Sequence, residues 1–206
     1  MTLNELEDKV LECKKCGELC SLSPFGYPHI GNKNSASPIM LIGQNPGKEH
    51  DYSEIKTKDD FLLNYDKNFR ICNLYKEITS WVDGDASIWD KIFFTNIVKH
   101  PTPKLRNVSD IEIDNCIDYL KVQIYNVKPR IIITLGSPAF TGILKHMFNK
   151  DVKFAEAKNR FHLLANYKSS IRFLPLYHPS FLSYNSQFRP MTIKLFKEGV
   201  KHANSF

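Results

Sequence analysis

An apolar run at residues 39–42 ends in the tight polar loop Gly43-Gln-Asn-Pro-Gly47. A run of this length is typical of a strand buried on both faces, as in a parallel sheet covered by helices. Open α/β sheets hold their ligands outside the carboxyl ends of such strands. The carboxamides of Gln44 and Asn45 do not titrate, but each can orient a water molecule or the edge of a substrate. Asn-Pro and Pro-Gly are also ordinary turn dipeptides, so the loop alone is equally compatible with a plain turn.

The same kind of pattern recurs along the chain and predicts an α/β fold. Strands are expected at residues 38–43, 92–98, 130–136 and 171–177, and helices at residues 2–12, 74–81, 109–126, 190–202 and from residue 137 onward. Residues 151–170 have no clear pattern, and Pro175 indicates that the last strand lies toward a sheet edge. The order predicts a three-layer αβα sandwich with a short, mostly parallel, four-stranded central sheet.

Length and composition favour one globular domain over residues 1–206, with residues 1–37 forming a helix and a cysteine-bearing arm packed on it. Hydrophobic residues make up 42% of the chain and charged residues 24%, which excludes a disordered protein. No apolar run approaches the roughly 20 residues of a membrane span, and the acidic N-terminus lacks the layout of a signal peptide. We therefore expect a cytoplasmic monomer, or a nuclear one in a host with a nucleus. The net charge of +6 is compatible with a polyanionic partner but does not require one.

The chain contains five cysteines, an odd number that does not suit disulfides. Cys13, Cys16 and Cys20 lie within eight residues of sequence, which indicates a metal site. A C-x-x-C turn can direct two thiolates to one metal or cluster, and further ligands must come from elsewhere. Cys72 is expected to be a buried structural thiol.

Polar groups follow all four predicted strands. They are, in chain order, the Gly43 loop, Asn96 with His100, Gly136-Ser137, and His178-Pro-Ser180. Because crossover helices keep parallel strands pointing the same way, these groups should line one crevice. Each is ordinary alone, since Asn96 fits a satisfied buried amide and His178 fits a core histidine. Their shared position favours a functional site.

These ordered motifs resemble the uracil-DNA glycosylase superfamily over nearly the whole chain. G-Q-N-P-G at residues 43–47 is similar to its first motif, H-P-S at residues 178–180 to its second, and residues 94–99 to the middle strand that supplies a base-reading asparagine. The C-x-x-C pair and Cys116 resemble the iron–sulfur branch, often called family 4. The resemblance implies a DNA repair glycosylase that acts on DNA containing uracil, or a related deaminated base. Such an enzyme flips the base out and hydrolyses its N-glycosidic bond without a covalent intermediate.

The resemblance also implies roles for three side chains. Asn45 would hold the water that attacks the sugar carbon. A neutral His178 would donate a hydrogen bond to uracil O2 and stabilise the leaving anion. Asn96, a donor and an acceptor at once, would pair with O4 and N3–H of uracil and distinguish it from cytosine.

The rest of the implied base pocket includes one departure from the family pattern. Gly43 and Gln44 would complete the substrate-binding loop, and Phe69, or alternatively Phe61, would stack on the base. The iron–sulfur branch usually has an acidic residue in place of Gln44, giving G-E-A-P-G. The Asn45 amide can position a water but cannot act as a general base.

The loop after His178 resembles the superfamily's minor-groove loop. It implies that Leu182 is the wedge that fills the vacated base stack. Arg189, Lys99 and the Ser180 hydroxyl would contact phosphate. Arg189 is equally compatible with a solvated loop charge.

The implied metal ligands also depart from the family pattern. The branch's third cysteine follows the middle strand, and His100 takes that place here, so the set becomes Cys13, Cys16, His100 and Cys116. We favour a 4Fe-4S cluster, because imidazole can replace thiolate on iron. A zinc site, substitution by Cys20, or an empty site remain alternatives.

Two other functions stay open. One is a DNA-binding or sensing protein that kept the fold and lost activity, which Gln44 and His100 would suit. The other is a nucleotide- or phosphate-binding α/β protein, although neither glycine-rich phosphate motif follows any predicted strand.

Overall fold

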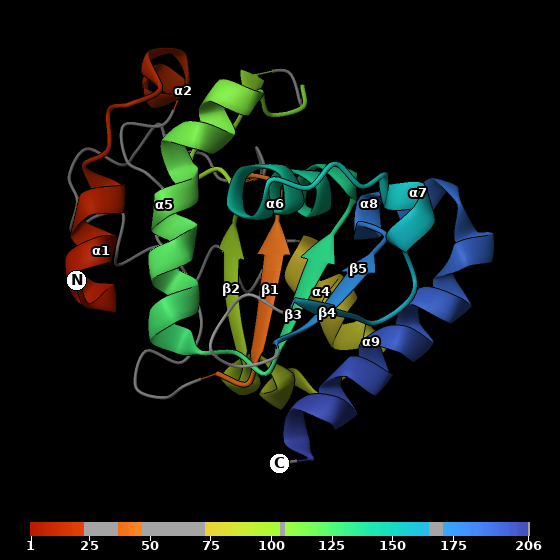
Figure 1. Cartoon of the computed structure of the whole chain (residues 1–206). Coiled ribbons are helices and arrows are strands. Elements are labelled where there is room, and N and C mark those ends of the chain that lie inside the picture. Colours follow the sequence, from red (N-terminus) through yellow and green to blue (C-terminus); the bar gives the residue numbers. More distant parts are fainter. Residues whose placement is uncertain (23–36, 47–72, 104–105, 165–170, 206) are drawn as a thin grey trace.

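The computed structural model describes residues 1–22, 37–46, 73–103, 106–164 and 171–205, which form three layers (Figure 1). In chain order the elements are α1 (Leu3–Leu11), α2 (Gly17–Leu22), β1 (Ile39–Gly43), α4 (Asn73–Trp81), η1 (Ala86–Lys91), β2 (Ile92–Asn96), α5 (Asp110–Val127), β3 (Ile131–Leu135), α6 (Ser137–Phe148), α7 (Phe154–Ala157), β4 (His162–Leu164), β5 (Ile171–Leu176), α8 (Pro179–Tyr184), η3 (Ser186–Phe188) and α9 (Arg189–Asn204). The described strands form a five-stranded sheet in the order β2-β1-β3-β5-β4. All neighbours pair in parallel except β4, which is antiparallel to β5.

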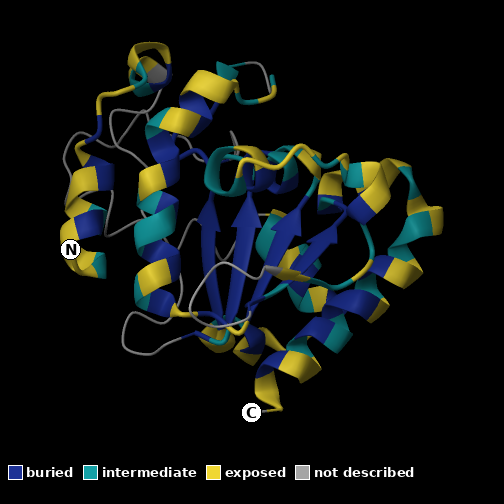
Figure 2. Ribbon diagram, viewed as in Figure 1, coloured by how far each residue is buried: buried dark blue, intermediate teal, exposed yellow. Residues whose placement is uncertain are grey.

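Successive strand residues face two separate hydrophobic layers, as the two-residue period of a strand requires. Leu41 packs in the layer that contains Trp81 of α4 and Phe196 of α9. Its neighbour Met40 packs in the opposite layer with Leu120 of α5. Every residue of β1, β2 and β3 is buried, which explains their predominantly apolar sequences (Figure 2). The predicted αβα sandwich is confirmed.

The predicted helices are also confirmed, and two of them begin at complete capping boxes. In α1 the Thr2 hydroxyl accepts from the backbone of Glu5, and the Glu5 carboxylate accepts from the backbone of Thr2. Ser109 and Glu112 form the same reciprocal pair at the start of α5. Helix α1 packs against α5 (Figure 1). Among the described helices, none combines the length and apolar character that crossing a membrane requires.

Two details of the sheet differ from the sequence-based prediction. Residues 151–170 contain α7 and β4, so the sheet has five strands and not four; β4 spans three residues, too few to establish a period. Pro175 lies in β5, which is flanked by β3 and β4 and is therefore not an edge strand. The proline is tolerated because β4 pairs only with residues 171–173. Its missing N–H faces that side of β5, beyond the last paired residue.

Candidate active site at the carboxyl edge of the sheet

The carboxyl ends of β2, β1, β3 and β5 lie side by side, so the loops that follow them are neighbours (Figure 1). Gly43 is in register with Asn96 across β1 and β2. Beyond the strands, the carbonyls of Gly43 and Gln44 accept hydrogen bonds of 2.9 and 3.0 Å from the backbone N–H groups of Ile97 and Val98. The first-motif loop is therefore fixed to the segment that follows Asn96.

Asn96 is buried, with 4% of its surface exposed, and its carboxamide lies against Gly43. A Cβ atom at Gly43 would stand 2.4 Å from Asn96 Oδ1, so only glycine fits there. Within the described parts of the chain, this carboxamide makes no side-chain hydrogen bond. The described polar atoms that are fully buried without a partner belong to Ser37, Thr134 and Asn159 and not to Asn96, so its carboxamide keeps an accessible side on which a polar ligand can bind.

Asn45 is held by a residue that the sequence analysis did not single out. Its Nδ2 donates to the Pro46 carbonyl at 3.0 Å and to Thr102 Oγ1 at 3.3 Å. The Thr102 hydroxyl donates its own hydrogen bond to the Arg106 carbonyl at 2.8 Å. Thr102 can therefore only accept from Asn45, which fixes the amide with Oδ1 as the available acceptor.

His178 caps the N-terminus of α8, and this position selects its tautomer. The Ser180 backbone N–H donates to His178 Nδ1 at 3.1 Å, and the Ser180 hydroxyl lies 2.7 Å from the same atom. Because a backbone N–H can only donate, the proton of the neutral ring is on Nε2. Burial lowers the pKa of His178 to about 4, so the ring is neutral at pH 7. His178 therefore offers an Nε2–H donor and no positive charge.

Gly136 allows the end of β3 to approach this histidine. Its φ of 86° lies in the left-handed region that favours glycine, and a Cβ there would stand 3.3 Å from His178 Cβ. Its N–H donates to the Leu176 carbonyl at 2.8 Å, which joins the ends of β3 and β5.

Lys99 supports the site from inside the protein. Its side chain is 0% exposed, and Nζ donates to Thr95 Oγ1 at 2.8 Å, to Gln123 Oε1 at 2.9 Å and to the Asn96 carbonyl. Burial lowers the pKa of Lys99 to about 7. The predicted phosphate contact by Lys99 is therefore wrong, because a side chain enclosed by protein cannot reach DNA.

The model of the uracil-DNA glycosylase superfamily matches residues 29–201 of the chain. The chain belongs to this superfamily. The type-4 uracil-DNA glycosylase of Saccharolobus solfataricus is 32% identical over 98% of this chain and 87% of the relative. The type-4 enzyme of Archaeoglobus fulgidus is 21% identical over 91% and 86%, and the type-5 enzyme of Pyrobaculum aerophilum is 27% identical over 97% and 91%. The superfamily inferred from the motifs is confirmed, and the type-4 names agree with its iron–sulfur branch.

In this superfamily member the loop after His178 folds as α8, η3 and the start of α9. Leu182 is 1% exposed and belongs to the core, so its predicted role as a wedge is wrong. Phe181 and Tyr184 on the same helix are 39% and 90% exposed. Arg189 forms an ion pair with Glu77 of α4 and is neither a free loop charge nor wholly buried.

Phe69 and Phe61, the two candidates for stacking on the base, lie outside the described residues, as does Cys72.

Four cysteines and one histidine gather where α1, α2 and α5 meet the loop after β2. This group, called the cysteine site below, consists of Cys13, Cys16, Cys20, His100 and Cys116. Cys16 is electrostatically coupled to Cys13 and Cys20, and Cys116 to Cys16 and Cys13. Asn115 Nδ2 donates to Cys16 Sγ at 3.3 Å. Cys20 Sγ lies 3.8 Å from His100 Nε2.

Burial disfavours the thiolate form of two cysteines in the cysteine site, Cys116 and Cys16. Burial raises the pKa of Cys116 to about 11, although the backbone N–H of Lys99 opposes the shift. Burial also raises the pKa of Cys16. Across the described segments, no three His, Cys, Asp or Glu side chains surround a single ion position. Three thiols with a fourth soft donor nevertheless fit an iron–sulfur cluster in chemistry, because iron binding displaces the thiol protons.

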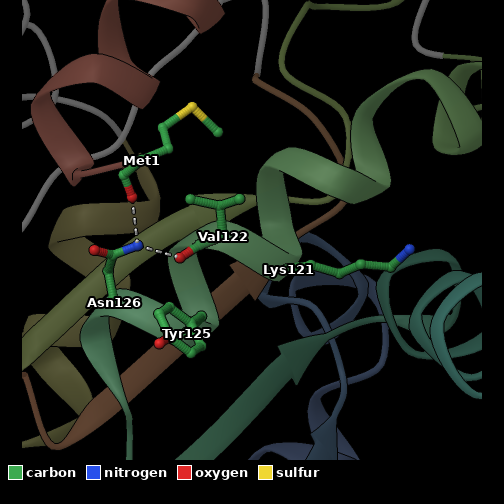
Figure 3. Close-up of a pocket in the computed structure, with 5 residues that line it drawn as sticks. All are labelled: Met1, Lys121, Val122, Tyr125 and Asn126. Carbon is green, nitrogen blue, oxygen red and sulfur yellow. Dashed lines mark hydrogen bonds between the residues drawn. The ribbon is translucent and has the colours of Figure 1, made fainter.

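A separate surface hollow of about 330 Å³ lies between Met1 and the C-terminal half of α5, lined by Lys121, Val122, Tyr125 and Asn126 (Figure 3). Asn126 Nδ2 bridges the carbonyls of Met1 and Val122. Helix α5 leads from this hollow into the amino end of β3, so the hollow lies at the opposite end of the sheet from the motif loops. It is therefore not part of the candidate active site.

Proposed function

We propose that this protein is a DNA repair glycosylase that hydrolyses the N-glycosidic bond of uracil, or a related deaminated base, flipped out of DNA. The observation that carries the proposal is that a carboxamide held deep beside Gly43, Asn96, and a neutral Nε2–H donor, His178, stand at the same edge of the sheet. Relatives named uracil-DNA glycosylases match nearly the whole chain.

Asn96 would read the Watson–Crick edge of the base. Its Oδ1 would accept from N3–H, and its Nδ2 would donate to O4 of uracil. Cytosine has an acceptor at N3 and a donor at N4. The Asn96 Oδ1 would then face an acceptor and its Nδ2 would face a donor, so neither hydrogen bond could form. The Gly43 backbone allows the carboxamide to sit at this depth.

Bond cleavage would depend on stabilising the departing base. As the glycosidic bond breaks, negative charge grows on uracil O2, and His178 Nε2–H would donate to it. A neutral donor does not need to transfer its proton. Asn45 Oδ1 would accept a hydrogen bond from the attacking water and direct its oxygen toward the sugar carbon, without acting as a base. The proton that the water loses on bonding to that carbon would neutralise the departing uracil anion.

DNA would be held by the exposed surface of α8 and the start of α9. We propose Arg189 and the Ser180 hydroxyl as phosphate contacts, the hydroxyl turning from His178 Nδ1, which keeps the Ser180 backbone N–H as its donor. Tyr184, which is 90% exposed, replaces Leu182 as the proposed wedge, while Phe181 one helical turn before it stacks on Tyr177. The net charge of +6 would favour the approach to a polyanion.

We also propose that the cysteine site holds a 4Fe-4S cluster, as the type-4 names of the relatives suggest. Cys13, Cys16 and Cys116 would supply three ligands, with His100 or Cys20 as the fourth. Such a cluster, when bound, would join the N-terminal segment to α5. The free thiols also suit a monomeric protein working in a reducing, cytoplasmic compartment.

An excision assay tests the proposal. Labelled single- and double-stranded oligonucleotides carrying uracil, hypoxanthine or xanthine are incubated with the protein, and abasic sites are then cleaved with alkali. We expect cleavage at uracil by the wild type and by Asn126→Ala, a matched asparagine at the opposite end of the sheet. Asn96→Ala should lose about 100-fold or more of the activity. DNA binding without cleavage by the wild type would instead identify a sensing protein.

A further inference from the structure

The cysteine site contains one potential donor more than a four-ligand cluster needs. Cys20 lies in α2, where its backbone N–H donates to the Cys16 carbonyl at 2.8 Å. Its Sγ lies 3.4 Å from the Cys13 carbonyl and 3.8 Å from His100 Nε2. The Cys20 sulfur therefore lies beside His100, the side chain expected to supply a ligand from the loop after β2. The chain has a histidine in that loop and an additional cysteine beside it in space.

The two candidates differ in how well they suit iron. Thiolate is the softer donor and the usual ligand of iron–sulfur clusters, whereas imidazole is the exception. His100 is 1% exposed and fixed in the loop after β2, while Cys20 is half-buried on a short helix that can adjust. A thiolate on iron also gains from a neighbouring hydrogen-bond donor, and a neutral imidazole with its proton on Nε2 provides one.

Cys13, Cys16 and Cys20 form a C-x-x-C-x-x-x-C run, so one short segment offers three thiols. Closely spaced runs of three cysteines with one distant fourth ligand are an established way to hold such clusters. Cys116 of α5 lies within electrostatic range of Cys16 and Cys13, so a fourth thiol stands near this run.

We propose that Cys20, and not His100, completes the ligand set with Cys13, Cys16 and Cys116, and that His100 Nε2 donates a hydrogen bond to the Cys20 sulfur. This inference rests on the proposed 4Fe-4S cofactor. It replaces a three-thiolate, one-imidazole site by a four-thiolate site, with the histidine one contact away from the iron.

The test compares four full-length proteins purified without oxygen: wild type, Cys20→Ala, His100→Ala and the matched control Cys72→Ala. Iron and acid-labile sulfide per chain and the absorbance near 400 nm are measured, with far-ultraviolet circular dichroism as a check of folding. We expect about four iron atoms per chain in the wild type and in Cys72→Ala. Cys20→Ala should lose the iron, and His100→Ala should retain it with a shifted absorbance band.

A second measurement does not depend on the folding of any variant. Pulsed electron paramagnetic resonance of the reduced wild type, with and without ¹⁵N-labelled histidine, distinguishes nitrogen bound to iron from nitrogen one hydrogen bond away. We expect only weak nitrogen coupling. Strong coupling, or full iron in Cys20→Ala, would overturn the ligand assignment while leaving the cofactor in place. A wild type without iron would overturn the cofactor proposal and this inference together, whereas uracil excision would test the proposed function independently.

Discussion

Asn45 and His178 are each oriented by a neighbouring group that can play only one part in a hydrogen bond, either donor or acceptor. The Ser180 N–H can only donate, so His178 Nδ1 must accept. The Thr102 hydroxyl is committed to the Arg106 carbonyl, so its oxygen must accept from Asn45. Both groups are therefore preorganised before any substrate arrives, and the reaction need not supply the free energy to orient them.

Replacing Thr102 with valine should misplace the attacking water. The change removes the acceptor that orients Asn45 while keeping the side-chain volume, so kcat for uracil excision should fall by about tenfold, the equivalent of one hydrogen bond. In Asn45→Ala the same substitution should have little further effect, because the group that it orients is already gone. Thr141→Val, on the surface of α6, is the matched control. If the losses of kcat in the double variant were fully additive, Thr102 would not act through Asn45.

The desolvation of His178, a side chain that stays partly exposed, also predicts how stability changes with pH. Its pKa is lowered by burial from 6.5 to about 4 in the folded protein. Between these values the unfolded chain binds more protons, so the free energy of unfolding is at its full value above pH 6.5 and falls as the pH drops toward 4. The loss attributable to His178 is at most about 3 kcal/mol. Urea unfolding of His178→Gln should show a correspondingly flatter profile over this range, and equal slopes would contradict a buried neutral ring.

At the scale of elements, the ends of β1 and β2 act as one unit. Backbone hydrogen bonds continue past both strands, from Ile97 to Gly43 and from Val98 to Gln44. Neither strand can shift alone to relieve a clash between them. The depth of Asn96 is therefore set by the absence of a side chain at Gly43.

Gly43→Ala should test this dependence. The added methyl group would stand 2.4 Å from Asn96 Oδ1, so the carboxamide must rotate away from its present position. Because small misplacements at a reacting centre are costly, uracil excision should fall by about 100-fold, with only a modest drop in Tm. Gly17→Ala is the control, since nothing lies within 4 Å of a Cβ there. Near-normal activity in Gly43→Ala would mean that Asn96 does not read the base.

Helix α8 gives a prediction about strandedness. Tyr184 is 90% exposed, and a wedge is needed only where a base leaves a stacked duplex. Tyr184→Ala should lower kcat/KM about tenfold on double-stranded substrate and leave single-stranded substrate nearly unchanged. Tyr125→Ala, an exposed tyrosine of α5, is the matched control. An equal loss on both substrates would exclude a wedge.

The strands, and the common edge of the sheet at which they end, could be predicted from sequence because each buried strand is a short apolar run followed by polar residues. The sequence did not reveal which side chains outside the predicted helices and strands are buried. Lys99 stands in a polar segment and resembles a surface charge, yet three acceptors enclose it. Leu182 stands in a polar loop that forms a helix, and its position on that helix faces the core. The distance between Cys20 and His100 depends on tertiary structure, so no spacing along the chain could reveal it.

At the scale of the whole molecule, the N-terminal segment is tied to the sheet through α5. Lys15 Nζ donates to the Asn115 carbonyl at 3.4 Å, and Asn115 Nδ2 donates in return to the Lys15 carbonyl at 3.3 Å. Arg106 pairs with both Glu18 of α2 and Glu112 of α5. Apolar side chains of the segment are buried as well, with Leu11 in one hydrophobic layer of the sheet and Leu19 in the other. A cluster bound at the cysteine site would add metal–ligand bonds between this segment and α5 to that packing.

Removal of iron should therefore destabilise the protein and weaken excision together. A link between Cys16 and Cys116 closes a loop of about 100 residues, for which the entropy of the unfolded chain predicts a contribution of about 5 kcal/mol. The iron-free protein should unfold at correspondingly lower denaturant. Cys116 also lies against the backbone N–H of Lys99, and Lys99 Nζ donates to the Asn96 carbonyl. Loss of iron should therefore displace Asn96, the proposed base-reading residue. Guanidinium titrations and excision kinetics are compared before and after chelation, with restored iron as the control; unchanged stability with lost activity would instead give the cluster a direct part in substrate binding.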